Sequence, residues 1–396
     1  ILLANSSSLY LKNHLTAKLI IEKMINFNKP YLTGKEMHYM YQAVYSGKIS
    51  GNGLFTKKCQ AFLEEKYGFK KTLLTTSCTD ALEMCAMLAD IQPGDEVIIP
   101  SFTFVSTALA FTRQGAKIVF ADSNAINPNI DAERIEALIT NRTKAIVPVH
   151  YAGIACDMDK IMALAKKYNL LVIEDAAQGI DSYYKGKALG SIGHLAAFSF
   201  HETKNINSGE GGMLAINDEK FITRAEIIWE KGTNRNQFFR GEVDKYGWID
   251  TGSSFLPSEI IAAYLYAQLE NIEDIQQKRK NIWLQYYNSL EAWCKKHNII
   301  MPIIPEYATN CGHMFYLIFN TVDQRSAFIA HLKQHDIYSV FHYLSLHKSP
   351  YFQNKYEGKE LVNSDRYTEC LVRLPLYYEL SNTDMDKIIT TIKSFI

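Results

Sequence analysis

Short apolar runs alternate with amphipathic helical patterns along residues 72–216. The runs hold four to six hydrophobic residues each and lie in GDEVIIPS (94–101), AKIVFAD (116–122), KAIVPVH (144–150), LLVIEDAAQ (170–178) and AAFSF (196–200). Helical patterns separate them in FVSTALAFTRQG (104–115), DAERIEALIT (131–140) and DMDKIMALAKKYN (157–169). Near-continuous Val, Ile and Leu are typical of strands buried on both faces. The pattern therefore predicts an α/β fold with a mostly parallel sheet between helices.

The last third of the chain has a different pattern. A long helix is expected over residues 258–298, with one break near Asp274. Strands are expected in HMFYLIFN (313–320) and RLPLY (373–377), around a helix in QRSAFIAHLKQHD (324–336). We predict a large domain over residues 24–260 and a smaller α+β domain over 261–396. Residues 1–23 lack the features of a secretory signal, and we interpret them as an N-terminal extension arising from an added segment or an upstream start.

Composition excludes several classes of function. The 42 basic residues balance 42 acidic ones, so no net field draws the protein to nucleic acid or to an anionic membrane. No apolar run reaches the roughly 20 residues of a membrane span. The seven cysteines include no CxxC pair, which favours free thiols in a reducing cytoplasm over disulfides or a metal site.

The carboxyl ends of the predicted strands are where a site is expected in such a sheet. Polar groups follow the strands at Ser101–Phe104, Asp122, His150–Tyr151, Glu174–Gln178 and Ser199–Lys204. An earlier candidate is LLTTSCTDALEM (73–84), where a strand leads through small hydroxyl residues into a helix. Unpaired N–H groups at a helix N-terminus bind phosphate, although an ordinary helix cap is the alternative.

Asp175 and Lys204 are the two candidates for chemistry. A carboxylate at the end of a buried strand is costly unless a positive group faces it, and the alternative is that Asp175 caps the next turn. Lys204 lies between the apolar strand AAFSF and the sequence SGEGG. A lysine amine is a poor nucleophile unless burial or a neighbouring cation lowers its pKa, and the alternative is a solvated loop lysine.

Together, these three features fit pyridoxal phosphate, which needs a phosphate cradle, an acid beside its pyridinium nitrogen and an amine for its aldehyde. A carboxylate about 4 Å from that nitrogen is worth on the order of 4 kcal/mol at an effective dielectric constant of 20. By contrast, no GxGxxG motif follows a strand, so a nicotinamide-dependent enzyme is poorly supported.

Five motifs carry a family resemblance from about Met24 to the C-terminus. In chain order they are PSFTFVSTALAF, VPVHYAG, VIEDAAQG, FSFHETKN and GEGGMLAIN, and together they resemble the sugar-nucleotide aminotransferases. This family implies fold-type-I pyridoxal-phosphate enzymes with a seven-stranded type of sheet. The segments SCT, SFHETKN, KGTNRNQFFRGEVDKY, GSSFL and VFHYLSLH are similar to the narrower group that makes dTDP-4-amino-4,6-dideoxygalactose.

The resemblance implies roles for single residues. Lys204 would attach the cofactor's aldehyde and carry the proton between carbons, and Asp175 would pair with the pyridine nitrogen. Gln178 would lie near the ring hydroxyl, and Phe104 would stack on the ring face. Phosphate ligands would be Cys78, Thr79, Ser199 and, in the partner subunit's site, Ser253 or Ser254. Many relatives have Asn at that last position, where this chain has serine.

Substrate residues are implied less directly. Lys231, Arg235 and Arg240 in KGTNRNQFFRG could hold the nucleotide diphosphate, or could form a solvated charged loop. His342 and Tyr343 could face the sugar, or could simply pack among core aromatics.

The resemblance implies a cytoplasmic homodimer with shared active sites. L-Glutamate would donate its amino group to C4 of dTDP-4-keto-6-deoxy-D-glucose, for a surface glycan of the enterobacterial common antigen type. Relatives with histidine in place of Lys204 dehydrate sugars, so the lysine indicates amino transfer. The C4-epimeric product, amination at C3 and a non-catalytic sugar-nucleotide-binding regulator stay open as alternatives.

Overall fold

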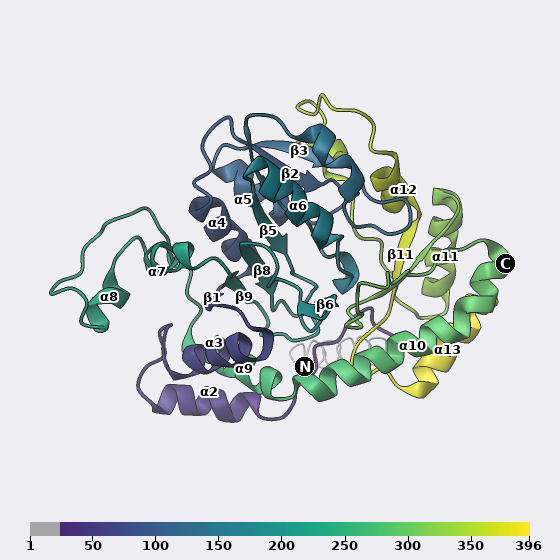
Figure 1. Ribbon diagram of the computed structural model, residues 1–396. Helices are drawn as coiled ribbons and strands as arrows, with labels where there is room; N and C mark the ends of the chain where they lie inside the picture. Colours follow the sequence, from purple (N-terminus) through teal and green to yellow (C-terminus); the bar gives the residue numbers. More distant parts are fainter. Residues whose placement is uncertain (1–23) are drawn as a thin grey trace, which may run out of the picture.

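The computed structural model describes residues 24–396, so the predicted extension 1–23 lies outside the described residues. Its centre is a seven-stranded sheet with the strand order β1-β9-β8-β5-β4-β2-β3 (Figure 1). The strands are β1 (Lys71–Thr75), β2 (Glu96–Pro100), β3 (Lys117–Ala121), β4 (Thr143–Ile146), β5 (Leu171–Asp175), β8 (Leu195–Ser199) and β9 (Gly212–Ile216). Only β9 runs against its neighbours β1 and β8, and the other pairs are parallel. The predicted α/β fold is confirmed.

Helices cover both faces of this sheet, as the uniformly apolar strands predict. On one face α4 (Cys78–Leu88), α5 (Val105–Arg113) and α7 (Ile222–Trp229) share one hydrophobic core with the strands. On the other face α3 (Leu54–Tyr67) and α9 (Glu259–Glu270) pack on β1, β8 and β9, while α6 (Met158–Tyr168) packs on β2, β4 and β5. Successive residues of a strand, such as Leu73 and Leu74, therefore enter opposite cores.

The helix predicted over residues 131–140 is wrong. This segment forms two 3₁₀ turns, η1 (Ala132–Arg134) and η2 (Glu136–Leu138). Its apolar residues Ala132, Ile135 and Leu138 recur every three positions, which suits the three residues per turn of a 3₁₀ helix.

The C-terminal part has its own core, formed by α10 (Ile272–His297), β10 (Phe315–Ile318), α11 (Val322–Gln334), β11 (Leu371–Leu374) and α13 (Asn382–Lys393). The long helix breaks at Asn271, between α9 and α10, close to the break expected at Asp274. The domain boundary at 260/261 stays a prediction. It falls inside the first turn of α9, a helix that packs on α2 (Glu36–Tyr45) and α3. The remaining elements are β6 (Tyr183–Tyr184), β7 (Lys187–Ala188), α8 (Arg235–Phe239), α12 (Val362–Cys370), η3 (Tyr151–Gly153), η4 (Glu219–Phe221) and η5 (Leu346–Lys348).

Within residues 24–396, no helix is both long and apolar enough to cross a membrane. The same part of the chain holds no cluster of three or more His, Cys, Asp or Glu side chains that could bind a metal ion.

Candidate active site

A cavity of about 440 Å³ lies where β5 and β8 end and α4 begins. Its wall includes the predicted cofactor residues Cys78, Thr79, Phe104, Asp175, Gln178, Ser199 and Lys204. The predicted sugar-facing residues His342 and Tyr343 line it as well. The structure thus brings together side chains that are up to 265 positions apart in the chain, from Cys78 to Tyr343 (343 − 78).

Lys204 is held by a tightly bonded loop that follows β8. The Lys204 N–H donates to the carbonyl of His201 (2.9 Å), and backbone bonds from Phe200 to Gly211 (2.8 Å) and from Glu202 to Gly209 (2.7 Å) close the loop. The next residue, Asn205, anchors the loop to the C-terminal part of the chain. Its amide donates to the Gln276 side chain (2.8 Å) and to the Cys311 carbonyl (2.9 Å). These hydrogen bonds therefore hold the backbone of Lys204 in a defined position.

The amine of Lys204 has a lowered pKa. Burial lowers its pKa to about 8, with the positive charge of Arg373 adding to this effect and Asp175 opposing it. An amine with this pKa is about half in the free-base form at pH 8, whereas an ordinary lysine with a pKa near 10.4 is less than about 1% free base. The alternative of a solvated loop lysine does not fit this setting.

We expect an amine-acylating reagent to modify Lys204 of the cofactor-free protein with a midpoint near pH 8. Because the folded-state pKa is lowered, the reactive free base forms as the pH rises through 8, about two pH units before exposed lysines become reactive. Peptide mass spectrometry after brief labelling at a series of pH values gives the midpoint for each lysine. A midpoint at Lys204 equal to that of exposed lysines such as Lys57 would contradict this expectation.

The acidic pair Glu174–Asp175 divides into two different environments. Asp175 faces the cavity, where its Oδ2 accepts from the Thr107 hydroxyl (2.7 Å) and its Oδ1 accepts from the Ala177 N–H (3.2 Å). Asp175 therefore does cap the following turn, through the Ala177 N–H, but its carboxylate still faces the cavity. Burial raises the pKa of Asp175, so a positive partner is needed to keep it ionised.

Glu174 points to the other face of the sheet, where its carboxylate is hydrogen-bonded within the protein. Its carboxylate accepts from the N–H groups of Gly190 (2.8 Å), Ile192 (2.8 Å) and Gly193 (2.5 Å). It also accepts from Nε2 of the buried His150 (2.9 Å), whose Nδ1 accepts the Cys156 N–H. Glu174 therefore holds a loop in place, and only Asp175 is left for chemistry.

Besides Lys204 and Asp175, the N-terminus of α4 lines the cavity. Ser77 caps the helix by accepting from the Asp80 N–H (3.1 Å), and the Asp80 carboxylate turns to the Thr76 hydroxyl. Among the described residues, no protein group accepts from the N–H groups of Cys78 and Thr79. With the nearby Ser199 hydroxyl, they are suited to bind a phosphate.

Gly212 makes room for this helix end. It is the first residue of β9, paired with Thr75 on one side and Ser199 on the other. A Cβ atom there would lie 2.3–2.4 Å from the Ser77–Cys78 peptide. The strand can approach the helix N-terminus only because residue 212 has no side chain.

We therefore expect Gly212→Ala to weaken retention of pyridoxal phosphate by at least about 10-fold, since the Ser77–Cys78 peptide must shift out of position. Absorbance of the cofactor after dialysis measures this retention. Gly247→Ala is the control, because a Cβ atom at Gly247 meets nothing within 4 Å and Gly247 has no positive φ. Equal retention by the two variants would contradict the expectation.

Other predicted residues surround the rim of the cavity. Gln178 donates to the Tyr343 hydroxyl (3.1 Å) and accepts from the Ala152 N–H (2.6 Å). The Phe104 ring is 55% exposed and lies 5.8 Å from the Tyr343 ring, so it is free to stack on a flat ligand. Thr107 and Arg373 also line the cavity, although no pattern in the sequence distinguishes them.

Five predicted residues lie outside this cavity of the single chain. They are Ser253, Ser254, Lys231, Arg235 and Arg240. Arg240 is engaged by the carboxylates of Glu226 (2.8 Å) and Glu242 (2.6 Å), which fits the alternative of a charged surface loop. Their roles toward phosphate or nucleotide stay predictions.

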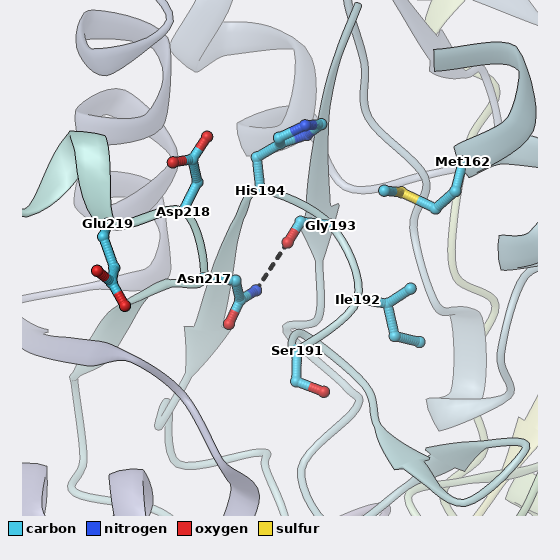
Figure 2. A pocket seen from close by; sticks show the side chains of 8 residues that line it. All are labelled: Met162, Ser191, Ile192, Gly193, His194, Asn217, Asp218 and Glu219. Carbon is cyan, nitrogen blue, oxygen red and sulfur yellow. Dashed lines mark hydrogen bonds between the residues drawn. The ribbon is translucent and has the colours of Figure 1, made fainter. Parts of the chain in front are cut away.

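A second pocket, of about 550 Å³, lies at the opposite edge of the sheet, where β5 and β8 begin (Figure 2). Its polar groups are already used by the fold. His194 Nδ1 accepts the Val172 N–H (2.9 Å), Asn217 donates to the Gly193 carbonyl (2.8 Å) and Asp218 caps η4. Its lining includes no lysine, so the site with chemistry is the smaller cavity.

The residues of that cavity fit pyridoxal phosphate. Two free N–H groups and hydroxyls suit its phosphate, a buried carboxylate without a cation bonded to it suits its pyridinium nitrogen, and an amine of lowered pKa suits its aldehyde.

Comparison with known proteins leads to the same conclusion. The model of the DegT/DnrJ/EryC1/StrS aminotransferase family matches residues 30–393. The spore coat polysaccharide biosynthesis protein SpsC of Bacillus subtilis is 32% identical over 385 residues, covering 93% of this chain and 96% of SpsC.

Solved structures agree in fold. Spr1654 of Streptococcus pneumoniae, assigned as a sugar aminotransferase, is 27% identical with a TM-score of 0.85, covers 94% of this chain and 97% of its own, and has been solved in PMP and PLP forms. The aminotransferase TlmJ of Streptoalloteichus hindustanus is 27% identical with a TM-score of 0.86, covering 94% of this chain and 98% of its own. The chain belongs to the DegT/DnrJ/EryC1/StrS family of pyridoxal-phosphate-dependent sugar aminotransferases.

Proposed function

We propose that this aminotransferase moves the amino group of L-glutamate to C4 of dTDP-4-keto-6-deoxy-D-glucose. The product is dTDP-4-amino-4,6-dideoxy-D-galactose, a precursor of a surface glycan of the enterobacterial common antigen type. The observation that carries amino transfer is the cavity in which Lys204, Asp175 and the α4 N-terminus meet. The sugar is supported by the segments SFHETKN, KGTNRNQFFRGEVDKY and VFHYLSLH. The seven unpaired cysteine thiols support a reducing compartment, the cytoplasm.

When bound, pyridoxal phosphate accepts the electron pair released as a C–H bond beside nitrogen breaks. The chain's own residues make this possible. Asp175 would pair with the pyridinium nitrogen as a carboxylate and so would keep that nitrogen protonated. The Lys204 amine takes the proton from the α-carbon of L-glutamate and later delivers a proton to C4 of the sugar. A pKa of about 8 suits both steps, because general acid–base catalysis is most efficient near the working pH.

The sugar ring is proposed to lie at the rim, against His342 and Tyr343, while Phe104 would stack on the cofactor ring. A homodimer would bring Ser253 or Ser254 to the partner's cofactor phosphate, and Lys231, Arg235 and Arg240 to the nucleotide diphosphate. Two features support this. The segment carrying α8 projects from the body of the protein (Figure 1), and Phe239, Trp248 and Ile249 near it are 66%, 82% and 55% exposed. Large exposed apolar side chains in one segment are typical of an interface.

Two alternatives concern the product. The geometry of the ketone face that receives hydrogen decides between the galactose and glucose epimers, and amination at C3 would require another keto sugar. The non-catalytic alternative is disfavoured, since both Lys204 and Asp175 are intact within the cavity.

The test is to incubate the purified enzyme with L-glutamate and dTDP-4-keto-6-deoxy-D-glucose and to identify the product by mass spectrometry and NMR. Small couplings of H4 to H3 and H5 mark the axial amine of the galactose product, and large couplings mark the glucose epimer. Lys204→Ala is the inactive control. No glutamate-dependent loss of the keto sugar would overturn the proposal.

A further inference from the structure

Arg373 is a buried cation in the wall of the active-site cavity. It lies on β11, and its backbone bonds to Val340 on the neighbouring segment in both directions (2.7 and 3.2 Å). Its side chain is 6% exposed, and it lines the same cavity as Lys204 and Asp175. Among residues 24–396, no carboxylate lies within ion-pair distance of its guanidinium.

Two aromatic side chains hold the guanidinium in place. Nη1 donates to Nδ1 of His342 (3.1 Å), and the Phe27 ring lies 4.9 Å from Cζ. Burial and the charge of Arg373 lower the pKa of His342 to about 4, so this imidazole is neutral near pH 7 and accepts the bond. A neutral histidine and an aromatic ring orient a cation without neutralising it.

The other edge of the guanidinium is not engaged. Nε is buried and has no hydrogen-bond partner, and no described residue accepts from Nη2. These two groups lie side by side on one edge and match the two oxygens of a carboxylate. A buried charged donor without a partner is costly, which favours a ligand that completes it.

The two carboxylates of the cavity do not neutralise Arg373. Its cations are Lys204 and Arg373, while its carboxylates are Asp175 and, at the rim, Glu210. Asp175 is assigned to the pyridinium nitrogen, and Glu210 lies 3.6 Å from His201. One buried positive charge is therefore left for an anionic ligand.

We propose that Arg373 binds the α-carboxylate of the amino-acid donor. This inference deepens the proposed function and rests on its amino-acid donor. The phosphate of the cofactor is already provided for at the N-terminus of α4. The α-carboxylate is attached to the carbon whose proton Lys204 removes, and Arg373 is close enough to Lys204 to lower the pKa of that amine. On its far side Arg373 borders a void of only about 10 Å³, so the anion must enter from the main cavity.

The test uses the holoenzyme without any sugar nucleotide. Stopped-flow absorbance of the cofactor follows the donor half-reaction with L-glutamate and with its α-amide, in which the α-carboxylate is neutral. For the wild type we expect the second-order rate constant to fall about 10–100-fold from glutamate to the amide. In Arg373→Gln the value for glutamate should fall to a similar extent, while that for the amide changes less than about 3-fold. Arg373→Lys keeps the charge without the paired donors and should lie between.

Retention of pyridoxal phosphate and thermal unfolding are measured in parallel, with Arg325→Gln, outside the cavity, as the control. An equal fall for glutamate and the amide would mean a structural role and overturn the proposal. Loss of the cofactor on dialysis, or a higher KM for the sugar nucleotide with an unchanged donor half-reaction, would also overturn it, since Arg373 would then bind a phosphate. A wrong assignment of the sugar leaves these measurements unaffected.

Discussion

Replacing Lys204 by alanine is expected to lower turnover with L-glutamate and the keto sugar by at least about 10³-fold. Positioned acid–base groups contribute about 10²–10⁴-fold on their own, and this residue also supplies the amine for the cofactor's aldehyde. Of the described lysines, only Lys204 lines the cavity, so no neighbouring amine can replace it. Single-turnover absorbance measures the rate, and borohydride reduction followed by peptide mass spectrometry shows whether pyridoxal phosphate is attached at residue 204.

Lys280→Ala is the matched control. Lys280 is also partly buried, but it pairs with Asp181 (3.1 Å) and lies outside the cavity. We expect this variant to keep the wild-type rate and the cofactor attached at Lys204. A Lys204→Ala enzyme with more than a tenth of the wild-type turnover would refute the assignment of Lys204 as the reactive amine.

The strands of the large sheet were predictable because burial on both faces leaves a plain mark in the sequence. EVIIP (96–100) and LVIED (171–175) each hold three consecutive aliphatic residues, and both form inner strands of the sheet. Residues 131–140 were harder, since apolar residues at every third position suit both an α-helix and a 3₁₀ turn. In the folded protein this segment forms two short 3₁₀ turns, which we attribute to tertiary packing.

The cofactor end of the cavity was also predictable. Parallel strands deliver their last residues to one edge, so Asp175 and Ser199–Lys204 had to lie close together there. The helix that starts at Cys78 faces the same edge because β9 pairs with both β1 and β8.

Arg373 and Thr107 were not predictable. Arg373 is one charged residue in a short strand, RLPLY, and no local pattern shows that its side chain crosses to the other part of the chain. Thr107 lies in the first turns of α5, where a small hydroxyl residue is ordinary. Both become visible only through contacts over long sequence separations, with His342 and Asp175 respectively.

Asp175→Asn is the second change with a large expected effect. Asparagine keeps the shape of the side chain and can still accept the Thr107 hydroxyl, but it removes the negative charge that we propose keeps the pyridinium nitrogen protonated. A charge pair about 4 Å apart is worth on the order of 4 kcal/mol at an effective dielectric constant of 20, which corresponds to about 10³-fold in rate. We therefore expect kcat to fall about 10³-fold, as measured by single-turnover absorbance with saturating glutamate.

The neighbouring carboxylate provides an unusually close control. Alternation along β5 sends Glu174 to the opposite face, where three backbone N–H groups and His150 use it. Glu174→Gln should lower the free energy of unfolding by about 2–3 kcal/mol, because those donors lose a charged acceptor, yet keep kcat within about 3-fold. Denaturant unfolding and kcat of the two variants thus separate the structural charge from the chemical one. If Asp175→Asn kept the wild-type rate, or if Glu174→Gln were the slower enzyme, the acid that faces the pyridinium nitrogen would have to be sought elsewhere in the cavity.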